Sequence, residues 1–118
     1  MRTIRIGSGA GYSGDRIEPA VELAEHGDIQ YLGFECLAER TIAREALTKL
    51  HNPELGYNPG LVERMRAVLP ECLRRGVRIV TNMGAANPLA AARSGESASA
   101  CSRAASRRAR SNTRARRD

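Results

Sequence analysis

Short hydrophobic runs alternate with segments of helical periodicity over the first ninety residues. β-branched and aliphatic runs bounded by glycine or polar residues predict three strands, at residues 3–6, 28–34 and 77–81. Apolar residues spaced three and four apart predict helices at residues 19–27, 38–50, 61–73 and from Asn87-Pro88 onward. Pro70 lies inside the third helix and should kink or break it.

The predicted order is β-α-β-α-α-β-α, which is typical of an α/β fold with a mostly parallel sheet and helices on both faces, in three layers. If the first strand is central, the loops after strands one and three face one crevice at the carboxyl ends of the strands. We expect residues 1–91 to form this domain in truncated form, with the remaining strands of the sheet missing.

The hydrophobic pattern stops after Leu89. No Val, Ile, Leu, Met, Phe or Tyr follows, and Arg, Ser and Ala supply 22 of the 28 residues from 91 to 118. Such a segment buries too little apolar surface to offset the entropy of ordering it, so residues 92–118 are expected to be a disordered basic tail. These residue types also arise when GC-rich codons are translated out of frame. We therefore hypothesise a frameshift near residues 91–94.

The net charge of +6 comes entirely from this tail. Residues 1–90 hold eleven basic and eleven acidic residues, whereas residues 91–118 hold eight arginines against two acids. One alternative function is therefore nucleic-acid binding through the tail. The tail contains no lysine and no aromatic side chain for base stacking, so no specific nucleic-acid partner is expected.

The three cysteines, Cys36, Cys72 and Cys101, show neither CxxC spacing nor a nearby histidine cluster. This odd number, without a signal peptide, indicates reduced thiols and a cytoplasmic location. No run approaches the roughly 20 apolar residues of a membrane span, and we predict no membrane partner and no metal site. Cys36 is interpreted as a buried structural thiol, and both histidines, His26 and His51, as surface residues at helix ends.

A glycine-rich segment, GAGYSG at residues 9–14, follows the first predicted strand and matches G-x-G-x-x-G. Glu35 ends the second strand, where a dinucleotide-binding unit has its ribose-binding acid. In that fingerprint the helix begins inside the glycine motif, whereas Pro19 places it several residues later. NAD and FAD are therefore disfavoured, and a dinucleotide-binding oxidoreductase fragment stays an alternative. The loop could instead bind a carboxylate or phosphate, or only form a flexible turn; its candidate residues are Gly9, Gly11, Gly14, Asp15 and Arg16.

Polar residues after the third strand and at the end of the second strand form two further, separate candidates. Asn82 and Asn87 follow strand three, where open parallel sheets bind ligands, although a turn residue and a helix N-cap would explain both. Glu35 is a weak candidate for a catalytic base or a ligand anchor. It could equally favour the N-terminus of the next helix through its charge.

Three segments taken together, residues 7–16, 31–39 and 81–88, resemble the N-terminal domain of the acyclic terpene utilisation family, AtuA type. The resemblance runs from about residue 1 to residue 92. It implies a bacterial, cytoplasmic protein several times longer than this chain, associated with catabolism of branched terpenoids such as citronellol and geraniol through acyl-CoA intermediates. It assigns no catalytic role, and it implies only a ligand-site set: Gly9, Gly11, Asp15, Arg16, Glu35, Asn82 and Asn87.

The leading hypothesis is therefore an N-terminal fragment of such a protein, with an acyl or carboxylated small molecule as its substrate. The resemblance is compatible with an enzymatic parent whose reaction is unassigned, and with a homo-oligomer of the full-length parent. The fragment itself is expected to be inactive, because the rest of the sheet would be missing.

Overall fold

The computed structural model describes residues 1–100, so predictions for residues 101–118 lie outside the part described. The elements follow the predicted order: β1 (Ile6–Ala10), α1 (Glu18–His26), β2 (Tyr31–Phe34), α2 (Glu39–His51), α3 (Leu61–Arg75) and β3 (Arg78–Thr81). A further helix begins at residue 88 and continues to residue 100. The α/β class is confirmed.

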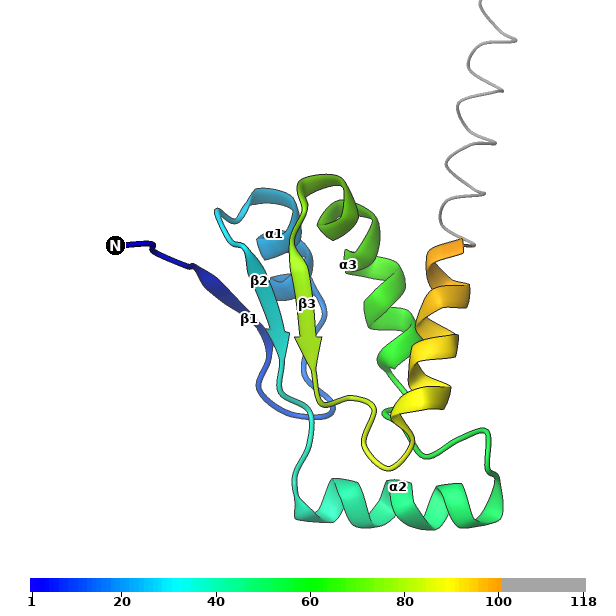
Figure 1. The fold of residues 1–118 in the computed structure, drawn as a ribbon. Coiled ribbons are helices and arrows are strands. Elements are labelled where there is room, and N and C mark those ends of the chain that lie inside the picture. The colour runs from blue at the N-terminus through cyan, green and yellow to red at the C-terminus, as the bar shows by residue number, and fades with distance from the viewer. Residues whose placement is uncertain (101–118) are drawn as a thin grey trace, which may run out of the picture.

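The sheet is parallel with strand order β1-β2-β3, so β2 is central (Figure 1). The condition of a central first strand is therefore not met. When successive crossover connections have the same handedness and step in the same direction across a sheet, their helices lie on the same face of that sheet. The chain moves from β1 to β2 and on to β3 without reversing, and β1 consequently lies at an edge.

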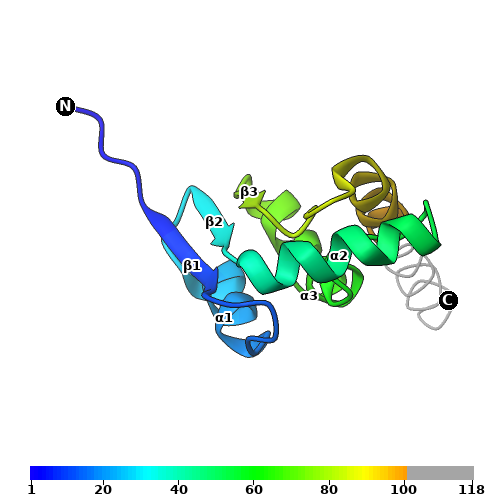
Figure 2. The same ribbon diagram turned by 90° about the horizontal axis from the view of Figure 1, so that it is seen from below.

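One helical layer covers the sheet. Helices α1 and α3 pack against each other and against the strands, and α2 lies across the space beyond the carboxyl ends of the strands (Figures 1 and 2). The core between helices and sheet includes Leu32 and Val68, both 0% exposed. Two helical layers were expected, one on each face of the sheet, and residues 1–100 contain one of them. The opposite face of the sheet is open, and its Ile6 and Val80 are 72% and 61% exposed.

Strand β1 covers Ile6–Ala10, whereas residues 3–6 were predicted, and two glycines beyond the predicted end belong to the strand. A Cβ on Gly7 would lie 3.1 Å from side-chain atoms of both Ile29 and Leu23, and a Cβ on Gly9 would lie 2.7 Å from the Phe34 ring. These glycines allow close packing, whereas the sequence pattern indicated a loop. The pairing of β1 with β2 shifts register between Ser8 and Ala10, which makes Gly9 the extra residue of a bulge.

Helix α3 runs without a break through Pro70, so of the predicted kink or break the break does not occur. An internal proline removes one backbone hydrogen bond and weakens a helix by about 3 kcal/mol. Val68 and Cys72, on either side of Pro70, are 0% and 1% exposed and pack in the same core, which offsets this loss. Leu73 departs from the predicted apolar stripe and is 57% exposed.

The C-terminal helix extends into the predicted tail. Residues 92–100 were expected to be disordered, but they are helical, and Ala98 is 1% exposed. Ser94 Oγ lies 3.0 Å from Tyr57 Oη, within hydrogen-bond distance. Alanine has the highest helix propensity, and its small side chain permits close packing, so this helix needs no large apolar residue.

Candidate functional site

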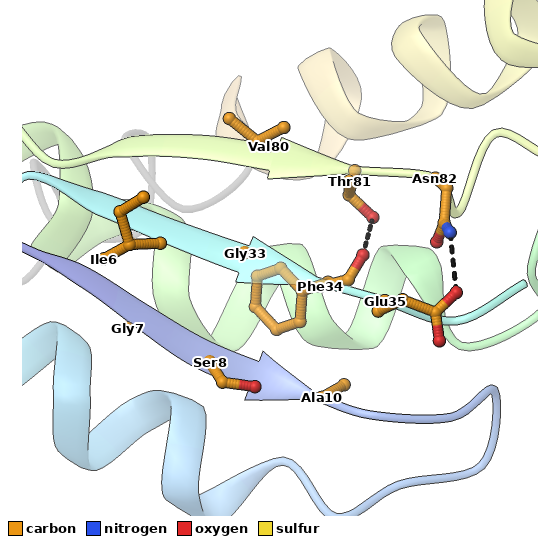
Figure 3. A pocket seen from close by; sticks show the side chains of 10 residues that line it. All are labelled: Ile6, Gly7, Ser8, Ala10, Gly33, Phe34, Glu35, Val80, Thr81 and Asn82. Atoms are coloured by element: carbon orange, nitrogen blue, oxygen red, sulfur yellow. Dashed lines mark hydrogen bonds between the residues drawn. The ribbon is translucent and has the colours of Figure 1, made fainter.

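A hollow of about 480 Å³ lies on the open face of the sheet and extends to the carboxyl ends of the strands (Figure 3). All three strands line it, and its wall is mostly aliphatic and aromatic. The polar residues Thr81, Asn82 and Glu35 gather where the strands end. In parallel sheets this end is the usual place for ligands, so we name the feature the sheet hollow.

The sheet hollow exists because Gly33 lacks a side chain. Gly33 pairs with Ser8 on one side and with Val80 on the other, in the middle of the open face. A Cβ at Gly33 would contact only the Gly7 carbonyl oxygen, at 3.7 Å. The space above the central strand is therefore free, and Ile6 and Val80 border it.

Glu35 and Asn82 form a fixed polar pair at the end of the sheet hollow. Asn82 Nδ2 donates to Glu35 Oε1 at 2.8 Å, and Asn82 Oδ1 accepts from the Cys36 N–H at 2.7 Å. The Leu37 N–H also donates to Glu35 Oε1, at 3.0 Å. The amide of Asn82 and then the N–H of Leu37 lower the pKa of Glu35. The carboxylate is thus ionised at neutral pH and can accept a hydrogen bond.

The glycine-rich loop is closed by its own aspartate. Asp15 accepts from the N–H of Gly11 and from the N–H of Arg16, both at 2.9 Å. These two donors, Gly11 first, lower the pKa of Asp15. The Gly11 N–H already has an acceptor within the loop. Helix α1 begins at Glu18, which confirms the predicted late start relative to Gly14.

The structure does not bring all the candidate residues together. Asn87 is 7% exposed, and its Nδ2 donates to the carbonyl oxygens of Pro53 and Leu55, both at 2.8 Å. It holds the 53–55 loop and does not line the sheet hollow. Arg16 is exposed and lies outside it too. Glu35 and Asn82 are the candidate pair that the fold places side by side.

Two buried polar residues, Arg64 and Asn58, were not predicted from the sequence. Arg64 is 3% exposed and donates to the backbone carbonyl oxygens of Asp15 and Arg16. Asn58 is 2% exposed, and its Nδ2 donates to Ser13 Oγ at 3.1 Å. Arg64 lies on the apolar stripe of α3, and this position in the sequence pattern indicates its burial. Together these residues anchor the glycine-rich loop to α3.

The two thiols and the histidines are where the sequence predicted. Cys36 is 1% exposed, and burial raises its pKa, so it is a protonated structural thiol. His26 and His51 are exposed and end helices α1 and α2. Within residues 1–100, no three His, Cys, Asp or Glu side chains cluster as metal ligands would.

Residues 4–106 match the family model described as acyclic terpene utilisation family protein AtuA. The chain belongs to this family. The AtuA match confirms the resemblance, and it continues past residue 92, where the resemblance was expected to end. No curated protein and no solved structure matches this AtuA chain significantly. Across residues 1–100, no helix has the length and apolar character needed to cross a membrane.

Acidification should destabilise this AtuA chain through Asp15 and Glu35. Folding lowers both pKa values, so the unfolded chain binds protons more readily. The stabilising contribution is fully present above the usual carboxyl pKa of about 4, and it is lost as the pH falls through the lower folded values. Urea unfolding at several pH values between neutral and acidic measures this loss.

The matched comparison is a double variant, Asp15→Asn with Glu35→Gln. Glu71, whose pKa is lowered mainly by Arg74, titrates in both proteins, so its contribution cancels. The double variant should show a shallower decline of stability with falling pH. Equal slopes in the two proteins would refute the assignment of the pH dependence to Asp15 and Glu35.

Proposed function

We propose that this chain takes part in acyclic terpene catabolism by binding a branched apolar chain in the sheet hollow, with the polar end of that chain at Glu35. The proposal rests on the aliphatic wall of the sheet hollow over Gly33 and on the ionised carboxylate of Glu35 at its end. Membership of the AtuA family supports the substrate class. Citronellol and geraniol are the type of terpenoid meant, degraded in the cytoplasm through acyl-CoA or carboxylated intermediates.

The charge of Glu35 restricts the group that lies beside it. A ligand carboxylate at that position would face a like charge, which is unfavourable. A hydroxyl can donate a hydrogen bond to Glu35, and a C–H acidified by a neutral thioester can give up a proton to it. The site therefore favours an alcohol or an acyl thioester over a free acid at this end.

The open side of the sheet hollow limits what the chain does alone. Burial contributes on the order of 0.8 kcal/mol per CH₂, and a surface that covers a ligand on one side yields roughly half of this. Summed over the carbons of a terpenoid chain, this gain is comparable to the free-energy cost of losing translational and rotational freedom on binding, an estimated 4–15 kcal/mol. We expect weak binding and no catalysis by the chain alone, because the site does not exclude water. In the functional protein, further polypeptide or a second copy covers this face.

The test is a titration of the full chain with geraniol and, separately, with geranic acid, monitored by NMR or calorimetry. Gly33→Val should abolish binding, because the valine side chain occupies the space over the central strand in the sheet hollow. Valine is also favourable in a β-strand, so the sheet should tolerate the change. Geraniol should bind more tightly than geranic acid, and Glu35→Gln should narrow that difference. Leu50→Ala, on the exposed side of α2, is the control and should bind as the unchanged chain does. Wild-type affinity in Gly33→Val would reject this site.

The origin of the C-terminal segment has a separate test. We propose that translation shifts frame beyond about residue 92, because the composition there changes to Arg, Ser and Ala. Because the family match extends to residue 106, we infer a shift later than residues 91–94. The nucleotide sequence should encode an amphipathic helix and a further strand in another frame. If neither other frame does so, the proposal fails.

A further inference from the structure

The open face of the sheet carries opposite charges at its two ends. Arg78 and Tyr31 are paired where β3 and β2 begin, and the Arg78 guanidinium lies 6.0 Å from the centre of the Tyr31 ring. Arg78 Nη1 also donates to Tyr31 Oη at 3.3 Å. The ionised carboxylate of Glu35 lies at the other end, just after β2. None of the ion pairs formed within residues 1–100 includes Arg78 or Glu35.

An apolar band lies between these charged ends and is left uncovered. Ile6 and Val80 border it and are mostly exposed, and Gly33 between them adds no side chain. Helices α1 and α3 both lie on the other side of the strands (Figure 2). Residues 101–118 contain no aromatic side chain and no aliphatic side chain larger than that of alanine, so they lack the apolar groups to cover the band. Neighbouring exposed apolar side chains of this kind mark an interaction surface.

The arrangement of these groups is self-complementary. Residues two apart in a strand point to the same face, so Gly33 lies midway between Tyr31 and Glu35, about 6.6 Å from each. Consider two copies with their open faces together, related by a two-fold axis perpendicular to the strands at the level of Gly33. This axis places Glu35 of each copy opposite Tyr31 of the other, where the Arg78 guanidinium lies over the ring. It also places Val80 opposite Val80, because Val80 is level with Gly33.

The charges distinguish this arrangement from the other face-to-face pair. A two-fold axis parallel to the strands would place Glu35 opposite Glu35 and would bring the two Arg78 ends together. Like charges that face each other are unfavourable, whereas the perpendicular axis brings opposite charges together twice. Sheets that pack face to face lie about 10 Å apart, so the side chains of the two inner faces touch.

We propose that a second copy of this chain docks on the open face of the sheet, with Glu35 of each copy paired with Arg78 of the other. Glu35 receives its two hydrogen bonds at Oε1, and Oε2 takes part in none within residues 1–100, so Oε2 is available to the guanidinium. The two sheet hollows then face each other over Gly33 and form one cavity closed on both sides. This closure rests on the function proposed for the sheet hollow, whereas the pairing of the two copies does not.

The experiment is sedimentation equilibrium of the full chain without any terpenoid, from about 10 µM to about 1 mM, because three short strands cover less than the roughly 800 Å² per partner of stable complexes. Physiological ionic strength screens the repulsion between the arginine-rich C-terminal segments. We expect the mean mass to rise from monomer towards dimer with concentration. Val80→Asp places two carboxylates opposite each other and should weaken association at least about tenfold. Leu50→Asp, on the exposed side of α2, should associate as the unchanged chain does. A chain that stays monomeric throughout, or equal association of these two variants, overturns the proposal.

A mixing experiment tests the paired charges themselves. Arg78→Glu and Glu35→Arg should each remain monomeric when alone, because each homodimer would bring like charges together. Their equimolar mixture restores one original and one reversed ion pair in every heterodimer, and it should associate at least about tenfold more tightly than either variant alone. A mixture that associates no better than its components contradicts the pairing, even if Val80→Asp fails to fold. Because neither measurement contains a terpenoid, failure here is distinguishable from failure of ligand binding in the sheet hollow.

Discussion

Replacement of Phe34 by alanine is expected to lower the free energy of unfolding by about 3–5 kcal/mol. Phe34 ends the central strand and is 2% exposed, and its ring occupies the space that Gly9 leaves in β1. Removal of the ring leaves a cavity that the edge strand can fill only by distorting its bulge. Urea unfolding followed by circular dichroism measures the loss.

Leu50→Ala is the matched control, because Leu50 is 81% exposed and its truncation should change stability by no more than about 0.5 kcal/mol. The contact of Phe34 with Gly9 can also be tested as a pair. Gly9→Ala puts its methyl 2.7 Å from the ring, and Phe34→Leu should relieve part of that clash. A Phe34→Ala loss as small as that of Leu50→Ala would place the ring outside the core.

The second large effect is expected for Asn58→Ala, at about 2–4 kcal/mol. The substitution removes the bond from Nδ2 to Ser13 Oγ at 3.1 Å and the bond from the Gly60 N–H to Oδ1 at 2.8 Å. Loss of one buried partner typically lowers stability by about 1–3 kcal/mol, and two separate contacts are affected here. Hydrogen exchange should also accelerate at the glycine-rich loop, since Asn58 ties that loop to α3.

Asn52→Ala is the comparison for this change. Asn52 is exposed, and its Oδ1 accepts one N–H, that of Glu54, at 3.0 Å. Its replacement should affect stability by about 1 kcal/mol or less and leave exchange at the loop unaltered. If both asparagine variants behave alike, Asn58 does not anchor the loop.

The order and type of the elements could be predicted because each rests on a local pattern. Pro19 and Gly27 bracket α1, and the apolar stripe of α3 marks its buried face. The end of β1 could not be predicted in the same way. Gly7 and Gly9 indicated a loop locally, whereas their actual cause is tertiary contact with Leu23, Ile29 and the Phe34 ring.

The site was predictable in part for the same reason. The rule for carboxyl ends singled out Glu35 and Asn82 separately, and it paired the loop of Asn82 with the glycine-rich loop on the condition that strand one is central. Strand β2 is central instead, so Glu35 and Asn82 end adjacent strands, and sequence periodicity carries no information on this strand order. Arg64 and Asn58 were missed, since a buried polar residue is specified by the partners that surround it, and those partners come from distant segments.

The C-terminal helix shows a limit of composition as a guide. The absence of large apolar residues after Leu89 predicted disorder from residue 92, yet Ala91 and Ala98 are buried in a helix that reaches residue 100. Alanine contributes little to a hydrophobic count, but it forms helices readily and packs closely. Residues 101–118, also predicted to be disordered, lie outside the described part of the chain.

The central claim is that the sheet hollow over Gly33 holds a branched apolar chain with its polar end at Glu35. Intermolecular NOEs between the methyl groups of geraniol and the methyl groups of Ile6 and Val80 test it most directly, because these side chains border the hollow on opposite edge strands. We expect NOEs to both residues in the unchanged chain and to neither in Gly33→Val. NOEs to Leu47 and Leu50 on the exposed side of α2, with none to Ile6 and Val80, would contradict it.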